Sequence, residues 1–471
     1  MKRKPRIGLL LICSNRFRGM GEGTGATYPE RQQKVADALI SHISEYADVV
    51  PTGQIYERED VKAAMDTFAR EKVDCVFANY MSWSDDFHWI RFLRDMYPIP
   101  ILFAHIVPDS IDYESTWDEG NFVQFLCNGG LVGTLQGSGS VARFNRPMLM
   151  KCAGTVAECA EELRHFAKAA CLRAEMKEST VGLMEYYNEV MWATYVDPYM
   201  FFAASGAELR FMSVATLEDY ASKVSDERVD EYIAYLREKY TVCDDVEDVH
   251  FRASIRTSLA LEDMAIDNGC CAVACNDVDK ALYQHMGLRP GFCPSPAHPE
   301  LTVTPEGDLG ACLATHILKN LSGAHTLMLE MSYIDRKDNT VVLVHGGPND
   351  YTDPAGKTMV ARDVRFAKSG WKHAGAPFAW HCISEGEKTV VHMSQDGDTF
   401  KMVVMMAESV PEELNLCSYS QGRIRLKGDP IETVKKLMDI GVTQHYAVAD
   451  GDNRKALRAY ANMMGYTYYE I

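Results

Sequence analysis

The sequence predicts an α/β protein with an N-terminal doubly wound parallel-sheet domain, a second α/β domain and a C-terminal, mainly antiparallel β-barrel domain. Short apolar strands alternate with amphipathic helices in the N-terminal third. A charged helix ends near Cys171 and a new strand–helix alternation begins, whereas several strands in succession follow residue 324. We therefore place the domains at 1–172, 173–323 and 324–471, since a chain of 471 residues normally divides into two or three domains.

The N-terminal domain is predicted from buried strands at 7–13, 48–50, 75–78 and 100–104, with helices at 30–47 and 61–71. The carboxyl ends of parallel strands meet at one edge of a sheet. The loops 14–28, 79–86 and 105–114 are therefore expected to line one crevice there. The glycines between residues 19 and 25 do not open a helix as GxGxxG, which argues against a dinucleotide site.

The second domain is predicted from strands at 180–184, 208–212 and 271–275 and a polar helix at 225–240. The barrel strands are expected at 325–330, 341–344, 389–393, 399–407 and 421–426. A final helix–strand–helix unit covers 429–464 and carries His445.

Composition narrows the class of function. The formal charge of −18 disfavours binding to nucleic acid, whose phosphates an acidic surface repels. No apolar run is long enough to cross a bilayer, and the stretch 7–13 is too short for a secretory signal. The 14 cysteines show no paired CxxC spacing typical of zinc and are predicted to be reduced core residues. These features favour a cytoplasmic enzyme that acts on a small molecule.

Four residues of the C-terminal part are candidate ligands of one divalent metal: Glu306, Glu330, His345 and His445. Glu306 lies in a loop before an apolar helix, Glu330 is expected to end a strand, and His345 follows the next strand directly before two glycines. Two carboxylates and two imidazoles suit manganese, iron, cobalt or magnesium. Asp308 has two interpretations, as the cap of the helix or as a group that orients a metal ligand.

Four segments resemble motifs of the L-arabinose isomerase and L-fucose isomerase families, which are metal-dependent aldose–ketose isomerases. They are Glu306-Gly307-Asp308, similar to a Glu-Gly-Asp loop; Met328-Leu329-Glu330, similar to Phe-Met-Glu; residues 339–345, similar to a strand that ends in a histidine ligand; and Gln444-His445, similar to a late histidine.

This resemblance implies that Glu306, Glu330, His345 and His445 bind Mn²⁺ or another divalent metal. It also implies proton transfer between C1 and C2 of a monosaccharide through an enediol or enediolate, with Glu306 and Glu330 as acid and base in an order that is left open. The family assembles as homohexamers or trimer-based oligomers, in which the N-terminal domain of a neighbour partly closes each site.

The predicted substrate contacts follow strands of the first two domains: Arg16, Arg18, Asn128, Tyr186, Tyr187, Asn188, Trp192 and Asn276. The loop 14–19 and the segment 128–130 differ from the arabinose isomerase pattern, which favours another sugar. Arg16 and Arg18 either bind an anionic substituent of that sugar or form a surface pair that faces acidic neighbours.

Two other classes of function fit the same residues. A sugar-binding protein without catalysis would use the N-terminal crevice. A metallohydrolase or epimerase would use the same metal ligands, and a hydrolase would need an open position for an activated water.

Overall fold

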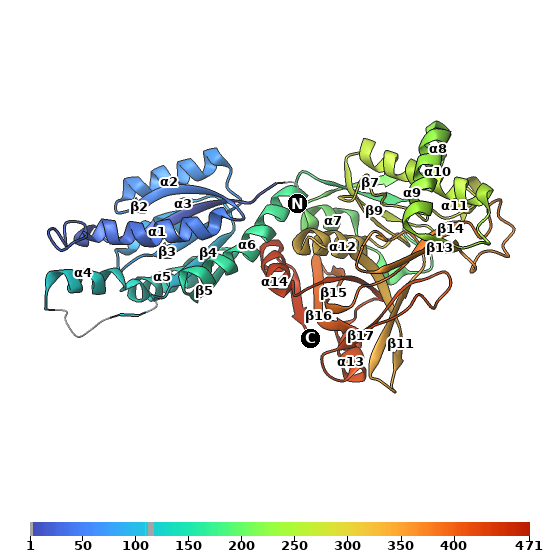
Figure 1. Cartoon of the computed structure of the whole chain (residues 1–471). Coiled ribbons are helices and arrows are strands. Elements are labelled where there is room, and N and C mark those ends of the chain that lie inside the picture. Colours follow the sequence, from blue (N-terminus) through green and yellow to red (C-terminus); the bar gives the residue numbers. More distant parts are fainter. Residues whose placement is uncertain (1–2, 109, 112–116) are drawn as a thin grey trace. The chain divides into compact units, whose positions relative to one another are not determined.

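The computed structural model describes residues 3–108, 110–111 and 117–471 (Figure 1). The chain forms two compact units: unit 1 is Met1–Glu175 with Lys455–Met464, and unit 2 is Met176–Arg454 with Gly465–Ile471. The predicted division into three domains stays a prediction. Residues 109 and 112–114 of the third predicted loop lie outside the described residues. No helix in the described part of the chain is both long and apolar enough to cross a membrane.

Unit 1 is built on a five-stranded parallel sheet in the order β2-β1-β3-β4-β5. The strands are β1 (Arg6–Ile12), β2 (Asp48–Ile55), β3 (Cys75–Tyr80), β4 (Ile101–Ile106) and β5 (Leu149–Gly154). The helices are α1 (Tyr28–Ser44), α2 (Arg58–Glu71), α3 (Asp86–Asp95), α4 (Glu119–Cys127), α5 (Gly130–Phe144), α6 (Val156–Met176) and α14 (Arg454–Met464). The predicted doubly wound parallel sheet is confirmed.

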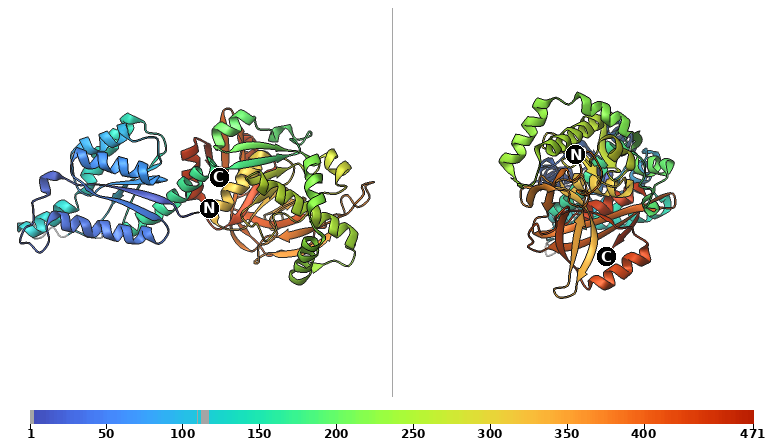
Figure 2. Two further views of the ribbon diagram at one scale, coloured as in Figure 1. Left: turned by 90° about the horizontal axis from the view of Figure 1, so that it is seen from above. Right: turned by 90° about the vertical axis from the view of Figure 1, so that its right-hand side faces the viewer.

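Helices cover both faces of this sheet, with α2, α3 and α5 on one face and α1 and α6 on the other (Figures 1 and 2). A capping box at Thr27 and Glu30 starts α1. Tyr46, just after α1, donates from its hydroxyl to the carbonyl oxygen of Ala160 in α6 at 2.7 Å. The glycines of α5 lie so close to Tyr80 that a β-carbon at Gly133 would lie 2.6 Å from its ring. This close approach holds α5 against the end of β3.

Unit 2 begins with a four-stranded parallel sheet in the order β10-β9-β6-β7. Its strands are β6 (Thr180–Met184), β7 (Glu208–Met212), β9 (Cys270–Cys275) and β10 (Thr302–Thr304). The helices that follow these strands are α7 (Pro198–Ser205), α8 (Val214–Lys223), α9 (Asp226–Lys239), α10 (Asp248–Asp267) and α11 (Lys280–His285). A buried apolar cluster joins α8, α9 and α10 to β9, as expected for a second α/β layer.

The remainder of unit 2 contains a closed antiparallel barrel of six strands in the order β16-β15-β18-β11-β12-β17, which β17 closes by pairing with β16. They are β11 (Thr326–Asp335), β12 (Thr340–His345), β15 (Gly386–Asp396), β16 (Thr399–Ser409), β17 (Ser420–Leu426) and β18 (His445–Asp450). Strands β14 (Pro377–Cys382), β13 (Lys357–Arg362), β8 (Thr241–Val242) and β19 (Thr467–Glu470) extend the sheet, and α12 (Leu309–Ser322) and α13 (Pro430–Ile440) pack on it. The predicted C-terminal barrel is confirmed.

One detail of the predicted barrel is wrong. The sequence predicts a strand that ends at Glu330, but β11 continues to Asp335 and forms a hairpin with β12. Residues 331–335 are half-buried or exposed, so they lack the continuous apolar pattern by which a buried strand is recognised. The register shifts between Met331 and Tyr333, directly after Glu330. Such bulges redirect side chains and recur beside functional sites.

Acid is expected to destabilise unit 2 through His381, which is fully buried in β14. Burial lowers the pKa of His381 to about 4. Between pH 6.5 and 4 the unfolded chain therefore binds more protons than the folded one, and stability falls as pH falls through this range. Chemical denaturation at pH 7.5 and 4.5 should show a loss that is about 2 kcal/mol smaller in His381→Gln than in the wild type. An equal loss in both proteins would contradict this account.

Candidate metal centre

Glu306, His345 and His445 converge in unit 2. Each offers one ligand atom, and these atoms all lie within 4.8 Å of one another. Glu306 lies in the loop between β10 and α12, His345 is the last residue of β12, and His445 is the first residue of β18. The rings of the two histidines lie 5.2 Å apart and are completely or almost completely buried. The side chain of Glu306 is 17% exposed and gives the cluster its access to solvent.

Both histidines are oriented by contacts of Nδ1. Nδ1 of His445 lies 2.8 Å from Oδ2 of Asp308, and Nδ1 of His345 lies 3.0 Å from the carbonyl oxygen of Gly346. Because both partners are acceptors, each Nδ1 carries the proton and donates it. In a neutral ring the lone pair is then on Nε2. Nε2 of His445 lies 3.2 Å from Oε2 of Glu306, and Nε2 of His345 lies 3.8 Å from the same oxygen. Histidine ligands of metals are fixed in this way by a carboxylate or a backbone carbonyl.

The buried Nε2 of His445 makes no well-directed hydrogen bond, although Oε2 of Glu306 lies 3.2 Å away. Burial would lower the pKa of His445, but contacts with Asp308 and Glu306 raise it to about 10, so this ring holds its proton between two carboxylates. A metal ion between Nε2 and Glu306 would replace that proton, because a histidine binds a metal through a deprotonated ring nitrogen. The donor set of one carboxylate and two imidazoles also suits a divalent metal such as Mn²⁺, Fe²⁺, Co²⁺ or Zn²⁺. The residues therefore fit a metal ion.

The backbone at Glu306 is strained, with φ of 65°, and Gly307 follows with φ of 67°. Left-handed backbone is uncommon for a residue with a β-carbon. The backbone N–H of Glu306 donates to Oδ1 of Asp277 at 2.9 Å, and that of Gly307 donates to the carbonyl of Cys275 at 3.1 Å. These bonds to the end of β9 hold the conformation that directs the carboxylate of Glu306 toward the histidines.

Asp277 is itself fixed by a buried ion network with Arg289 and Asp363. Nε of Arg289 donates to Oδ2 of Asp277 at 2.8 Å, and Nη1 lies 3.3 Å from Oδ2 of Asp363. A β-carbon at Gly347 would lie 2.6 Å from Asp277 and 2.9 Å from Arg289, so only glycine fits there. Sequence reasoning missed this network, because it joins residues 12 and 74 positions apart and no local pattern marks such pairs.

Asp308 caps the helix, as predicted, and also contacts His445; that this contact orients a metal ligand stays a prediction. Oδ1 accepts from the backbone N–H of Ala311 at 3.0 Å and caps α12, while Oδ2 accepts from His445 at 2.8 Å. The start of a helix in the α/β layer is thereby tied to a strand of the barrel.

The pKa values of Glu306 and Glu330 are shifted in opposite directions. Burial would raise the pKa of Glu306, but contact with His445 and the charges of His345 and Arg289 lower it to about 2. Burial and the charge of Glu306 raise the pKa of Glu330. Burial lowers the pKa of His345 to about 3, so this ring is neutral at physiological pH.

Glu330 borders the three-residue cluster. It lies directly opposite His445 in the pairing of β11 with β18, so both side chains are on the same face of the sheet. The charges of Glu306, His445 and Arg365 all act on its carboxyl group. Its role as a fourth metal ligand stays a prediction.

The predicted substrate residues of unit 2 lie in or beside the segment after β6. Tyr186 and Trp192 are exposed, and Tyr187 donates to the carbonyl of Val196. A β-carbon at Gly307 would lie 2.9 Å from the carbonyl oxygen of Tyr186 and 3.2 Å from Asn276. Asn188 is buried and accepts from the backbone of Val190 at 3.2 Å. This segment therefore flanks the loop that carries Glu306.

In unit 1, Arg16 and Arg18 do not point at a common partner. The guanidinium of Arg16 lies 5.0 Å from the ring of Trp83 and 3.7 Å from Asp85, and that of Arg18 lies 4.9 Å from the ring of Tyr56. The contact with Asp85 is the kind expected of a surface arginine that faces an acidic neighbour, and it involves Arg16 alone. Their binding of a sugar stays a prediction.

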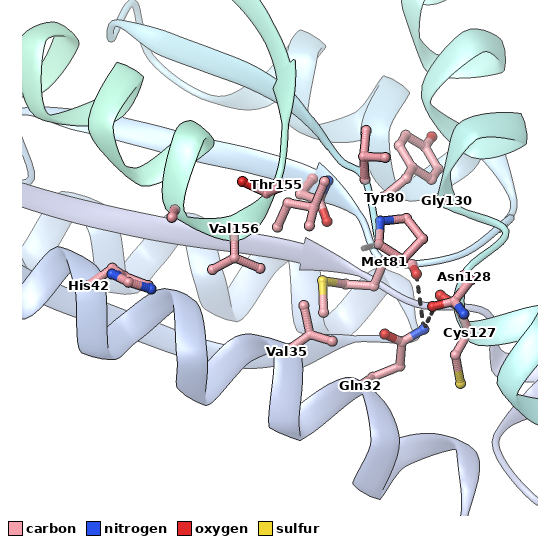
Figure 3. Close-up of a pocket in the computed structure, with 15 residues that line it drawn as sticks. Gln32, Val35, His42, Tyr80, Met81, Cys127, Asn128, Gly130, Thr155 and Val156 are labelled. Carbon is pink, nitrogen blue, oxygen red and sulfur yellow. Dashed lines mark hydrogen bonds between the residues drawn. The ribbon is translucent and has the colours of Figure 1, made fainter. Parts of the chain in front are cut away.

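Asn128, at the end of α4, lines a pocket of about 310 Å³ in unit 1 (Figure 3). Nε2 of Gln32 in α1 donates to the carbonyls of Met81 at 2.9 Å and Cys127 at 3.2 Å, which fixes one wall. Asn79 and Thr155 add polar groups, and Val35 and Val156 add apolar ones. The pocket lies at the carboxyl ends of β3 and β4, where doubly wound domains bind ligands.

Asp308→Asn is expected to weaken Mn²⁺ binding about 10- to 100-fold, the usual effect of losing a partner that orients a metal-binding histidine. The amide keeps one acceptor oxygen for the helix cap, but its NH₂ group cannot accept from Nδ1 of His445. Calorimetric titration with Mn²⁺ measures the loss of affinity. Chemical denaturation should show a smaller loss of stability for Asp308→Asn than for Asp308→Ala, because alanine also removes the helix cap, which is worth about 1 kcal/mol. Wild-type affinity in Asp308→Asn would show that His445 needs no such partner.

Comparison with known proteins gives no family assignment: no protein-family model matches, and no curated protein matches the sequence. Among solved structures, the chain is similar to an ABC-transporter periplasmic solute-binding protein from Actinobacillus succinogenes with bound D-allose, at 12% identity and a TM-score of 0.17 over 60% of this chain and 81% of that chain.

It is also similar to a periplasmic sugar-binding protein from Legionella pneumophila, at 10% identity and a TM-score of 0.16 over 68% of this chain and 95% of that one. A third similarity is to the fructose-binding periplasmic domain of a hybrid two-component system, at 14% identity and a TM-score of 0.16 over 60% and 99% of the two chains. At TM-scores this low the alignments establish no shared fold, and no functional argument rests on them.

Proposed function

We propose that this chain is a metal-dependent aldose–ketose isomerase that acts on a monosaccharide. The observation that carries the proposal is the arrangement of His345 and His445, in which both Nδ1 atoms are used internally and both Nε2 atoms lie near Glu306. Mn²⁺ is the proposed metal, because carboxylate and imidazole ligands suit it and the family resemblance implies it. A homohexamer or trimer-based oligomer and a cytoplasmic location belong to the same proposal.

When bound, the metal would neutralise negative charge that develops on two neighbouring sugar oxygens. The protein supplies two carboxyl groups with separated pKa values, an arrangement typical of paired acid and base residues. The pKa of Glu306 is lowered and that of Glu330 is raised, so in this proposal Glu306 is the group that accepts a proton and Glu330 the group that donates one. Asp308 keeps the proton of His445 on Nδ1.

The test is an isomerase assay with Mn²⁺, Co²⁺ or Mg²⁺ on a panel of pentoses, deoxyhexoses and anionic sugars. We expect conversion of at least one sugar that requires a metal, stops on chelation and is lost in Glu306→Gln. A protein that holds Mn²⁺ yet isomerises none of these sugars would contradict the proposal. Hydrolysis or epimerisation by the same metal-loaded protein would favour the other metal-dependent classes.

Sugar binding without catalysis is a second candidate, favoured by the pocket that Asn128 lines in unit 1. Its size and mixed polar and apolar walls suit a small polar molecule. In that case calorimetry would show sugar binding that persists in EDTA and is weakened by Asn128→Leu. Binding that requires the metal would exclude this candidate as the main function.

A further inference from the structure

Arg365 lies beside the metal centre in unit 2. Its guanidinium lies against Gly346 so closely that a β-carbon there would overlap Nη1. Gly346 directly follows His345 and accepts from its Nδ1 at 3.0 Å. The charge of Arg365 also acts on the carboxyl group of Glu330. Arg365 therefore borders the cluster at the residue after His345, close enough for its charge to act on Glu330.

The side chain of Arg365 has no ion-pair partner among the described residues. The nearby carboxylate of Asp363 pairs with Arg289. Arg365 donates to Oδ1 of Asp363 through its backbone N–H at 3.2 Å, and the charge of its guanidinium acts on that carboxylate without forming an ion pair. Arg362 on β13 differs, because it lies 3.7 Å from Asp245. Arg365 is thus an exposed guanidinium with unused donors.

Two aromatic rings hold this guanidinium in place. Its central carbon lies 5.1 Å from the ring of Tyr419 and 5.4 Å from the ring of Phe366. Stacking uses the faces of the planar group and leaves its edge N–H donors available for a carboxylate or a phosphate. An arginine held in this way loses less side-chain entropy when it binds a ligand.

The surroundings of the metal centre are acidic. Glu306, Glu330 and Asp308 lie in or beside it, and the whole chain carries a formal charge of −18. These carboxylates repel an anionic substituent that lies away from the metal ion's own charge, unless fixed positive charge offsets the repulsion. Arg365 supplies that charge next to the cluster, where a neutral sugar would not need it.

We propose that Arg365 binds an anionic substituent, a carboxylate or a phosphate, on the sugar that the metal centre takes. This inference rests on the proposed function and names its substrate class as acidic or phosphorylated sugars. The donors of Arg365 can pair with two oxygens of either group.

The test compares glucose, glucuronate and glucose 6-phosphate, which share six carbons and differ at C6. Calorimetry on the Mn²⁺-loaded wild type should show at least one anion bound about tenfold more tightly than glucose, as expected for charged hydrogen bonds. Arg365→Gln should remove this preference, and Arg365→Lys should keep part of it, because lysine retains the charge without the planar fork. The matched control Arg362→Gln should leave the preference unchanged.

The two anions distinguish the two possible substituents. Tighter binding of glucuronate indicates that Arg365 binds a carboxylate, and tighter binding of glucose 6-phosphate indicates that it binds a phosphate. Equal binding of all three sugars, no binding of any, or a preference that survives in Arg365→Gln would overturn the proposal for Arg365. A Mn²⁺ titration before sugar is added tests the metal site of the proposed function independently of Arg365. If metal binds and neutral sugars are isomerised without any preference for anions, only the role of Arg365 fails.

Discussion

The His445→Gln protein is expected to bind Mn²⁺ more than about 100-fold more weakly than the wild type, exceeding the effect of losing an orienting partner. His445 is completely buried between Asp308 and Glu306, and its Nε2 is one of the three ligand atoms of the cluster. Glutamine preserves much of the side-chain volume but offers no nitrogen lone pair to a metal. Calorimetric titration measures the affinity directly.

Stability gives a second readout of the same loss. A ligand present at 100 times its dissociation constant stabilises a folded protein by about 2.7 kcal/mol. Mn²⁺ should therefore raise the melting temperature of the wild type and not that of His445→Gln. His325→Gln is the matched control, because His325 directly precedes β11 and pairs with Asp350 outside the cluster. Wild-type Mn²⁺ affinity in His445→Gln would refute the proposed ligand set.

Glu330→Gln is expected to reduce isomerase turnover about 10²- to 10⁴-fold, the usual effect of removing a general acid or base. Burial and the charge of Glu306 raise the pKa of Glu330, which favours it as the proton donor, and an amide cannot transfer a proton. The Mn²⁺ affinity of this variant separates an acid beside the three-residue cluster, which changes the affinity by less than about tenfold, from a fourth ligand, whose loss weakens it further.

Kinetics and exchange can both measure this prediction. Nuclear magnetic resonance in D₂O should show deuterium incorporation at C1 or C2 with the wild type and not with Glu330→Gln. Glu408→Gln is the control, since Glu408 is an exposed glutamate on barrel strand β16. If turnover falls only in proportion to Mn²⁺ affinity, Glu330 is a metal ligand and not a separate acid.

Much of the fold and part of the site follow from local sequence pattern. His345 lies at the end of an apolar strand, as predicted, because the run before it is buried and glycines follow. Glu306 precedes an apolar helix whose cap, Asp308, is a common capping residue. These features depend on neighbours in the sequence, which hydrophobic periodicity and turn chemistry describe.

Features that depend on tertiary pairing could not be predicted in the same way. The support of Glu306 by Asp277 and Arg289 joins three separate loops, and the burial of Arg289 has no local signature. The placement of Arg365 depends on Gly346 and Tyr419, which lie on other segments. Glu330 was placed at a strand end because the exposed half of β11 has no apolar pattern.

The most direct test of the metal centre is anomalous diffraction from crystals of the protein soaked in Mn²⁺. The account predicts one strong anomalous peak bonded to Nε2 of His345, Nε2 of His445 and the carboxylate of Glu306, with Nδ1 of His445 still bonded to Asp308. A peak at another place, or no peak at saturating Mn²⁺, would contradict the metal centre and the isomerase chemistry proposed from it.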